Sequence, residues 1–437
     1  QIYNFRYNIY SSEWPVANRA IELYLQKKSE NEGWERQING LSNNEKANLL
    51  LEKHTFKELL ADVEQRNLQN NIVGLEASRL FARSEINMGV DAFRDSLYAM
   101  LKRNTFLNIK FENMLDTLGE MSRTDLYSYL KEWEQLTPLP FYSIGEPELT
   151  KVVNKGGEEF FVLKVLVSNN SDYDGIIQMN VLQNGWWYQP MEDPRARKKV
   201  EIAAHTSKEF VSVWEEQIRD VEINTMVSGN LPYMIRQSIG NVKQERNKIV
   251  KDTIYTLPES SLEMPGEVIV DNEDSTLFVL STPAVVGLLP KWLDKVEDTS
   301  FKYSGISWWR APLQWTATTN AKYYGKYIRS AYVIKSGDGS QTATWKIPVP
   351  EAGQYELYYH VFKDDELRWN DRLQGEYHFR VAYDSEMEDA YINLRKANEG
   401  WEQLGTYYFS ADTVRVVLTD ECKLRSVTAD AVKIVKR

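Results

Sequence analysis

The stretch QTATWKIPV at 341–349 decides the fold of the C-terminal part of the chain. Two sets of side chains alternate along it, Thr342, Thr344 and Lys346 against Ala343, Trp345 and Ile347. Because successive side chains of a strand point to opposite faces, the pattern predicts a strand with one buried face and one wet face. Such a strand belongs to a sheet that covers a hydrophobic core.

Further strand-like segments surround this stretch. They are rich in β-branched and aromatic residues and are separated by turn residues. The segments are EVIVDNED at 267–274, GQYELYYHVF at 353–362, GEYHFRVAYD at 375–384, WEQLGTYYF at 401–409, DTVRVVLTD at 412–420 and TADAVKIVKR at 428–437. We therefore expect a β-sandwich over 265–437.

Residues 1–143 have helical periodicity instead. In DAFRDSLYAMLKR, the residues Phe93, Leu97, Met100 and Leu101 form the apolar stripe of an amphipathic helix. In MSRTDLYSYLKEWEQL, the same pattern comes from Leu126, Tyr129, Leu130 and Trp133.

The ends of this second helix also have sequence signals. Ser122 is placed to cap it, with Asp125 at the third position, and TPLP at 137–140 ends it. We therefore expect an α-helical domain that stops near residue 143.

Five strand-like segments follow between about 145 and 230. They are ELTKVVNK, EEFFVLKVLVSN, GIIQMNVLQ, KKVEIAAH and KEFVSVWEE. Their spacing predicts a small immunoglobulin-like sandwich over 144–232. The charged run after it suggests a linker at 233–264. The fold class is thus multidomain α + β, with an N-terminal helical domain and two β-sandwiches.

Composition excludes several classes of function. The net charge of -11 speaks against binding of nucleic acid, which needs concentrated Lys and Arg. The least polar stretch, 275–290, is interrupted by Pro283 and Pro290, so we expect no membrane span. The single cysteine, Cys422, excludes an intrachain disulfide and is expected to be a structural thiol.

The sequence shows no self-contained active site. The histidines His54, His205, His360 and His378 fall in no zinc motif, and we read His360 and His378 as ordinary half-buried side chains. Glu388 and Asp389 are adjacent, so on a strand they would point apart. We therefore expect no catalytic residue, no metal ligand and no cofactor in this chain.

Residues of about 60–230 resemble the part of M1-family zinc aminopeptidases that follows their active site. The resemblance is carried by NNIVGLEASRLFARSEINMGVDAFRDSLYAMLKR at 70–103 and MSRTDLYSYLKEWEQLTPLPFYSI at 121–144. In that family the zinc motif lies upstream of these segments. Asn71 occupies the position of the family's transition-state tyrosine. The resemblance implies peptidase architecture, with zinc only if a catalytic half lies outside this chain.

The last part of the chain, about 265–437, resembles the C-terminal domain of golvesin and of xanthan-lyase-like proteins. The resemblance is carried by VIVDNED at 268–274, YYGKYIRSAYV at 323–333, GSQTATWKIPVPEAGQYELYYHV at 339–361 and GWEQLGTYYFSADTVRVVLTD at 400–420. It implies a β-sandwich of the kind found on secreted and surface enzymes of bacteria. A periplasmic, cell-surface or secreted location follows as an expectation.

Aromatic residues gather around GISWWRAPLQW at 305–315. Neighbouring side chains on a strand face opposite ways, so at least one of two adjacent tryptophans belongs to the core. The remaining rings either form an aromatic platform for a glycan or peptide, or cover the sandwich as a core of their own. The candidate binding residues are Trp308, Trp309, Trp315, Tyr323, Tyr324 and Trp369.

Three functions remain open from the sequence. The first is a non-catalytic envelope protein that acts in binding or assembly, with a protein partner or a larger parent chain. The second is a zinc aminopeptidase whose catalytic half lies outside this chain, and the third is a carbohydrate-binding module of a surface enzyme. The chain begins QIYNFRYNIY, as a processed N-terminus or a piece of a longer protein would.

Overall fold

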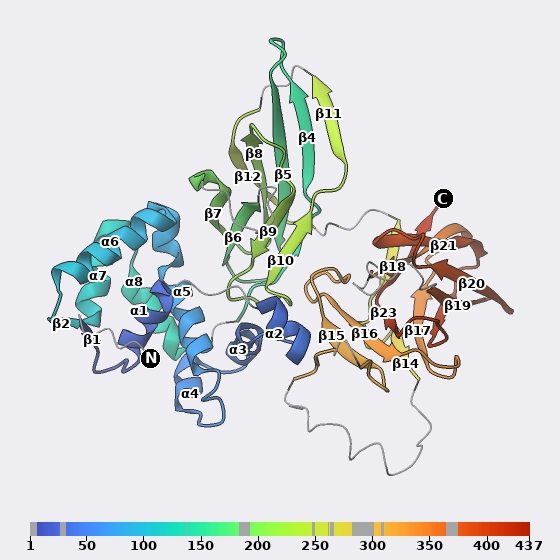
Figure 1. Ribbon diagram of the computed structural model, residues 1–437, viewed down its shortest axis with the longest axis horizontal. Helices are drawn as coiled ribbons and strands as arrows, with labels where there is room; N and C mark the ends of the chain where they lie inside the picture. Colours follow the sequence, from blue (N-terminus) through green and yellow to red (C-terminus); the bar gives the residue numbers. More distant parts are fainter. Residues whose placement is uncertain are drawn as a thin grey trace. The chain divides into compact units, whose positions relative to one another are not determined.

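Figure 1 shows the computed structural model, which describes residues 7–26, 32–136, 138–182, 193–246, 250–260, 262, 266–281, 301–306, 310–363 and 375–437. The chain divides into two compact units. Unit 1 comprises residues 1–30 and 43–262, and unit 2 comprises residues 31–42 and 263–437.

The fold class expected from the sequence is confirmed. A helical region precedes a series of β-sheets, and the sheets pack as sandwiches. Within the described residues, no helix has both the length and the apolar character needed to cross a membrane.

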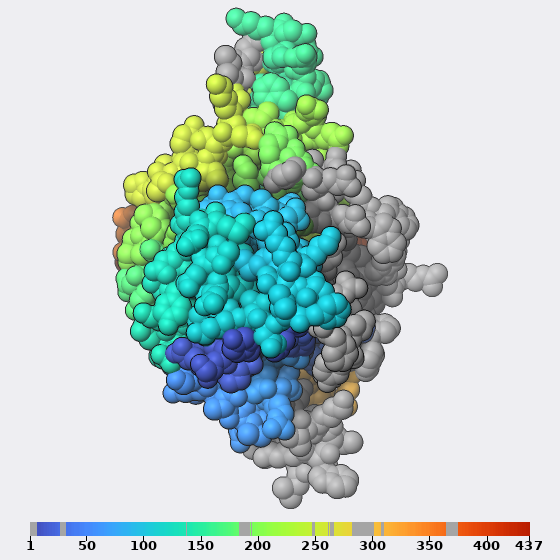
Figure 2. Space-filling model, turned by 90° about the vertical axis from the view of Figure 1, so that its left-hand side faces the viewer, coloured from blue at the N-terminus to red at the C-terminus, as the bar shows by residue number. Residues whose placement is uncertain are grey.

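Unit 1 begins with the helical region. A short parallel pair of strands in it joins residues 8–10 to residues 108–110. Its helices are α1 (Ala17–Leu25), α3 (Asn43–Leu51), α4 (Phe56–Ala61), α5 (Gln69–Met88), α6 (Val90–Arg103), α7 (Phe111–Ser122) and α8 (Leu126–Lys131), and its strands are β1 (Asn8–Tyr10) and β2 (Asn108–Lys110). Figure 2 shows the N-terminal segment, in dark blue, lying across this face below the cyan helices.

The helical stripes predicted from the sequence are confirmed. Phe93, Leu97 and Leu101 are buried on α6. Trp133, which follows α8, is 2% exposed and packs edge-on against Phe56 with ring centroids 4.6 Å apart. Such aromatic contacts add to the stabilisation that burial itself provides.

The predicted start of α8 was wrong by three residues. Ser122 ends α7, and Arg123 takes the left-handed backbone conformation with φ 53°, which breaks the helix there. Asp125 is itself the N-cap of α8, because its carboxylate accepts a hydrogen bond of 3.1 Å from the Ser128 N–H. The residues after α8 form a short 3-10 turn at Glu132–Glu134, so the helical pattern ends before TPLP as predicted.

The sandwich of unit 1 has two sheets. One has the order β10-β9-β6-β7 and the other β11-β4-β5-β8-β12, with β3 paired to β5. Leu163 and Phe210 from the second sheet share a buried core with Ile177 and Val221 from the first. The strands are β3 (Tyr142–Ile144), β4 (Glu148–Val153), β5 (Glu159–Asn169), β6 (Gly175–Leu182), β7 (Arg197–Ile202), β8 (Thr206–Trp214), β9 (Asp220–Asn224), β10 (Met234–Ser238), β11 (Val242–Arg246) and β12 (Thr253–Pro258).

The segment 233–264, expected as a linker, instead contains three strands of this sandwich. β10 pairs with β9, β11 pairs in parallel with β4, and β12 pairs with β8. β11 and β12 lie at the two edges of their sheet, where side chains stay in water. An edge strand therefore tolerates the charged run that made this segment resemble a linker.

A buried ion pair joins the helical region of unit 1 to its sandwich. Glu85 on α5 is fully buried and pairs with Lys199 on β7, whose side chain is 7% exposed. Tyr24 on α1 donates its hydroxyl to the same carboxylate at 2.7 Å, and Arg94 on α6 lies 3.8 Å away. Burial, followed by the charge of Glu85, raises the pKa of Tyr24. One carboxylate thus connects three helices to a strand.

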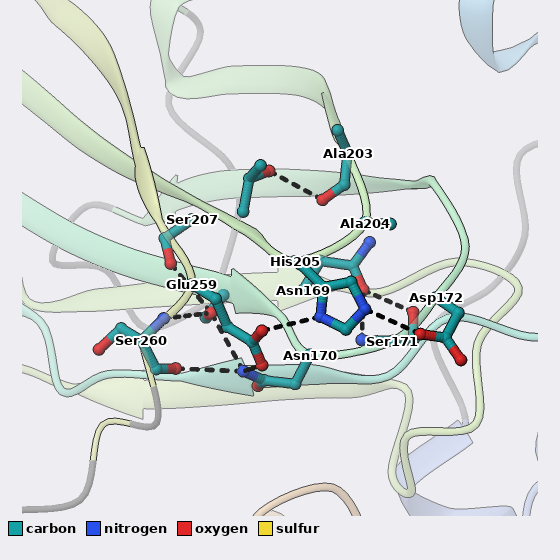
Figure 3. A network of polar contacts seen from close by, with 12 residues as sticks. Asn169, Asn170, Ser171, Asp172, Ala203, Ala204, His205, Ser207, Glu259 and Ser260 are labelled. Atoms are coloured by element: carbon teal, nitrogen blue, oxygen red, sulfur yellow. Dashed lines mark hydrogen bonds and ion pairs between the residues drawn. The ribbon is translucent and has the colours of Figure 1, made fainter.

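A surface network around His205 joins the turns before β6 and β8 to the end of β12, as Figure 3 shows. The imidazole lies between Asp172 and Glu259, with each nitrogen 2.8 Å from a carboxylate oxygen. Asn170 donates to Glu259 at 2.8 Å and to the Ser260 carbonyl at 3.2 Å. The hydrogen bonds to Asp172 and then Glu259 raise the pKa of His205 above its ordinary value.

Unit 2 is the C-terminal sandwich together with one helix from near the start of the chain. Its sheets have the orders β13-β24-β18-β21, β14-β17-β22-β19-β20 and β15-β16-β23. The elements are α2 (Glu32–Asn39), β13 (Glu267–Val270), β14 (Phe278–Leu280), β15 (Thr316–Thr319), β16 (Ser330–Lys335), β17 (Thr342–Pro348), β18 (Gly353–Val361), β19 (Glu376–Tyr383), β20 (Glu386–Asn393), β21 (Gly400–Phe409), β22 (Thr413–Thr419), β23 (Ser426–Ala429) and β24 (Val432–Lys436).

The alternation of the deciding stretch is confirmed in β17. Ala343, Trp345 and Ile347 are fully buried, while the residues between them are partly exposed. Glu388 and Asp389 point apart on β20, as predicted: Tyr383 donates its hydroxyl to the first, and His378 lies 2.7 Å from the second.

The segment around α2 is held to the rest of unit 2 by contacts to its own backbone. Thr319 on β15 donates its hydroxyl to the Gly40 carbonyl at 2.9 Å. Gly40 has φ +79°, and a Cβ there would lie 2.3 Å from the Ser304 backbone. Only glycine fits this position, because both the conformation and the space exclude a side chain.

Replacing Lys199 by alanine tests the buried ion pair. Because Glu85 would stay buried without its strongest partner, we expect Lys199→Ala to lower the free energy of unfolding of unit 1 by about 3–5 kcal/mol. Lys198→Ala, one position along β7, serves as the matched control and should change it by no more than about 0.5 kcal/mol. Chemical denaturation measures both, and equal losses in the two variants would contradict the assignment.

The His205 network predicts a pH dependence. Because the folded-state pKa is raised, the stabilisation is fully present below the unfolded-state pKa of about 6.5 and is lost as pH rises through the folded-state pKa. His205→Asn should therefore lose more stability relative to wild type at pH 5.5 than at pH 9, with asparagine chosen because it tolerates the φ of 52° found here.

The exposed His54 provides the control for this measurement. His54→Asn should show no such difference between the two pH values. A loss for His205→Asn that is the same at both pH values would show that the network does not hold a proton as inferred.

Candidate binding site

A buried carboxylate organises one region of unit 2. Asp430, between β23 and β24, is fully buried, and both of its oxygens accept from the Tyr324 backbone N–H at 3.2 Å. His360 on β18 places its Nδ1 2.9 Å from the same carboxylate. Burial raises the pKa of Asp430, and the nearby His360 opposes this rise.

Asp271 adds a second acidic group to this region. It follows β13 in the VDNED segment, and burial together with repulsion from Asp430 raises its pKa well above the usual range. Its carboxylate accepts a hydrogen bond of 2.6 Å from the Asn272 backbone N–H. Ionising both acids at once is costly, and the hydrogen bonds to each carboxylate offset part of that cost.

The loop that carries Tyr324 has a defined backbone. Arg329 donates to the Ala321 carbonyl at 2.8 Å, and the Tyr323 N–H donates to the Asn320 carbonyl at 3.1 Å. A Cβ on Gly325 would lie 1.9 Å from the Ile328 carbonyl oxygen, so the turn needs glycine there. The position of Tyr324 is therefore fixed by the backbone on both sides.

Three rings meet above Asp430, and we name Tyr324, His360 and Trp401 the aromatic face. Trp401 on β21 is the direct partner of His360 in the register with β18, and their ring centroids are 5.1 Å apart. The Tyr324 ring lies 5.0 Å from Trp401 and 5.8 Å from His360. All three side chains are partly exposed, so the cluster forms part of the protein surface.

Polar groups border the aromatic face. Lys433 on β24 places its ammonium 4.9 Å from the centre of the Trp401 ring and 2.7 Å from a Glu267 oxygen. Lys322 and Glu399, each two residues before a ring of the face, form a partly exposed ion pair of 2.8 Å. The Lys433–Glu267 pair is nearly buried, so the Lys322–Glu399 pair is the one of the two that offers hydrogen-bond donors and acceptors to solvent.

This arrangement suits a ligand that has both an apolar face and hydroxyl groups. Rings that are already packed and hydrogen-bonded lose little freedom when a ligand stacks on them. The Lys322–Glu399 pair offers hydrogen bonds beside the stacked surface. Among the residues that the structure describes, no group of three or more His, Cys, Asp or Glu side chains is placed to hold a metal ion.

The structure separates the binding residues predicted from the sequence. Tyr324 belongs to the aromatic face. Tyr323 is 6% exposed and packs against Phe362, with ring centroids 4.7 Å apart, so it belongs to the interior. Trp315 packs against the sandwich core, and its buried indole N–H has no hydrogen-bond partner in the described part of the chain. Trp308, Trp309 and Trp369 lie outside the described residues.

Sequence reasoning missed Trp401 and gave His360 no role in binding. The signal that connects them is their register, since both occupy outward positions on neighbouring strands. The other histidine considered for a metal site, His378, lies on β19 in a different sheet. It stacks on Tyr391 at 4.8 Å and is held between Asp389 and Glu421.

Asn71, the position compared with the transition-state tyrosine, lies in the first turn of α5. Its side-chain N–H donates to the Asn44 side chain on α3 at 2.8 Å. This contact gives Asn71 a structural role between two helices.

The C-terminal part of the chain matches a known family. Residues 309–436 match the family model of the Golvesin C-terminal domain, which is less than half of the chain. The match includes every residue of the aromatic face and supports the golvesin-like sandwich expected from the sequence. It does not reach residues 60–230, and the expected resemblance to M1-family aminopeptidases finds no support. No curated protein sequence is significantly similar to the chain.

Solved structures similar to parts of the chain include three from bacteria. Xanthan lyase from Paenibacillus is 16% identical over 69% of this chain and 27% of its own, with a TM-score of 0.28. CBM35 from Cellvibrio japonicus Abf62 is 13% identical over 26% of this chain and 75% of its own, with a TM-score of 0.18. Bacteroides uniformis β-glucuronidase is 11% identical over 72% of this chain and 32% of its own, with a TM-score of 0.19.

The chain thus spans 27% of the length of that xanthan lyase. At these TM-scores the likenesses carry no inference about the site or its ligand. The family to which the C-terminal residues are similar is that of the Golvesin C-terminal domain.

Proposed function

We propose that this chain is a non-catalytic binding protein whose unit 2 binds a neutral glycan on the aromatic face. The observation that carries the proposal is the partly exposed Trp401–Tyr324 pair of rings, with the Tyr324 backbone N–H bound to the buried Asp430. The proposal corresponds to the third function left open by the sequence, a carbohydrate-binding module.

The chemistry of a sugar ring fits this surface. One face of a pyranose carries mostly C–H groups, and these pack against an aromatic ring in the way that apolar side chains do. The hydroxyls at its edge then reach the Lys322–Glu399 pair, whose side chains are partly exposed. Because the cations of the surface are paired with carboxylates, a neutral glycan avoids leaving a charge unpaired on binding.

The family match supports the location as well as the role. A golvesin-type sandwich implies a secreted or surface protein, so we propose a periplasmic, cell-surface or secreted location in bacteria. A larger parent chain or protein partner would then supply any catalysis, and no cofactor is needed for binding. The peptidase alternative would require zinc from a part outside this chain, and the comparisons give it no support.

Trp308, Trp309 and Trp369 stay predicted binding residues, because stacking surfaces commonly use several rings. The peptide alternative for the same surface also stays open to test. The variants and ligands described next test both the role of these tryptophans and the peptide alternative.

Affinity electrophoresis tests the proposal. Native gels containing arabinoxylan, galactomannan or the acidic polysaccharide xanthan retard a protein in proportion to its affinity. We expect retardation by at least one of the two neutral polysaccharides, and a loss of about ten-fold or more in affinity for Trp401→Ala, because a central stacked ring is removed. Tyr408→Ala is the matched control, since Tyr408 is an aromatic residue on the same strand that is 61% exposed.

Several outcomes would overturn the proposal. One is wild-type protein that no neutral polysaccharide retards, and another is a Trp401→Ala variant that keeps its affinity. Loss of binding in Trp309→Ala but not in Trp401→Ala would place the site at the tryptophan pair instead. Retention on immobilised casein peptides, without retardation by polysaccharides, would favour a peptide ligand. Thermal unfolding of each variant checks that it remains folded.

A further inference from the structure

Unit 1 contains a cavity of about 360 Å³ that the proposed function does not use. It lies between α5, the end of α8 and the turn before β6. Its size falls within the range of small-molecule sites. Its charged and aromatic lining comes from Glu76, Arg79, Arg83, Tyr129, Glu132, Trp133, Asp172, Tyr173 and Asp174.

The charges of this lining are unbalanced. Arg83 pairs with Glu201 at 2.6 Å, and Asp172 lies 2.8 Å from a nitrogen of His205, so both already have a partner outside the cavity lining. Arg79 is then the one guanidinium left, and it is shared by Glu76 at 3.6 Å and Glu132 at 3.1 Å.

Asp174 adds a further negative charge. It accepts a hydrogen bond of 2.8 Å from the Ala204 backbone N–H, and no cation pairs with it in the described part of the chain. Three carboxylates thus face one guanidinium, which leaves a surplus of two negative charges when all are ionised.

Glu76 is the deepest of these acids. It is 3% exposed, and its distance of 3.6 Å from Arg79 is longer than a good hydrogen bond. Burial raises the pKa of Glu76, and Arg79 opposes this only in part. A cation bound beside Glu76 would offset the cost of keeping this carboxylate ionised.

One buried polar group next to the cavity has no hydrogen-bond partner among the described residues. The Tyr142 hydroxyl is buried, and it makes no hydrogen bond within the described residues. It lies against Gly175, which lines the cavity, since a Cβ on Gly175 would come within 1.8 Å of it. Because unpaired buried hydroxyls are costly, this group indicates a missing hydrogen-bond partner at this wall.

The rest of the lining is apolar. Leu80, Trp133, Leu139 and Val227 line the cavity and are nearly fully buried. The charged groups are reached from solvent, since the side chains of Arg79 and Glu132 are 28% and 37% exposed. A ligand with a charged head and an apolar body therefore matches both kinds of lining residue.

We propose that this cavity binds a small organic cation, a primary ammonium on an apolar body, with the ammonium at Glu76, Glu132 and Asp174 and the body against Trp133 and Leu139. Ammonium groups are recognised by carboxylates together with aromatic walls. The cavity shares no residue with the aromatic face, so its test does not depend on the outcome of the glycan proposal.

Three probes of one shape and different charge test this inference. Benzylamine is cationic at neutral pH, benzyl alcohol is neutral and benzoate is anionic. Isothermal titration calorimetry of the full chain at pH 7.5 should give binding of benzylamine at least about ten-fold tighter than of benzyl alcohol, with no binding of benzoate.

Two neighbouring variants locate the site. Glu132→Gln removes half of the surplus charge and should weaken benzylamine binding by about ten-fold. Glu134→Gln, two residues along, is the matched control. Glu134 pairs with Lys57 and does not line the cavity, so its removal should change the affinity by less than about two-fold.

The proposal fails if none of the three probes binds at millimolar concentration, or if benzoate binds as well as benzylamine. It fails also if Glu132→Gln and Glu134→Gln weaken benzylamine binding equally, because the effect would then be one of general charge. Both substitutions are at partly exposed side chains and should leave the fold intact, which thermal unfolding checks.

Discussion

The structure of unit 1 depends on one buried carboxylate. Glu85 projects from the long helix α5. Its carboxylate contacts the hydroxyl of Tyr24, the guanidinium of Arg94 and the ammonium of Lys199. An isolated charge at this depth would be strongly unfavourable, so the three partners are required together. Since they come from α1, α6 and β7, satisfying this one group fixes how the helices lie against the sandwich.

Unit 2 also contains a buried carboxylate, but this one has a different role. Asp430 is also fully buried, but its partners are a loop backbone and a histidine at the surface. Satisfying this carboxylate therefore holds the backbone of Tyr324 and the ring of His360. A buried acid joins structural layers in one unit and fixes an exposed surface in the other.

Much of the fold was predictable from local pattern, whereas the site was not. The stripes of α6 and α8 and the alternation of β17 are local signals, and each is confirmed. The edge strands of residues 233–264 were not predicted, because a charged edge strand and a linker have similar composition. Trp401 and His360 are far apart in sequence, and only the register of β18 with β21 brings them together. The resemblance to golvesin predicted the sandwich, but it did not indicate which of its rings are exposed.

The placement of α2 has a consequence for how the chain is made. Residues 31–42 belong to unit 2, although most of that unit is synthesised only after residue 262. During vectorial synthesis this segment emerges early, and Thr319, which contacts Gly40, is added 279 residues later. A fragment that starts at residue 263 would leave that hydroxyl without its acceptor. Neither unit can therefore be completed as one uninterrupted piece of chain, and the order of synthesis differs from the order of assembly.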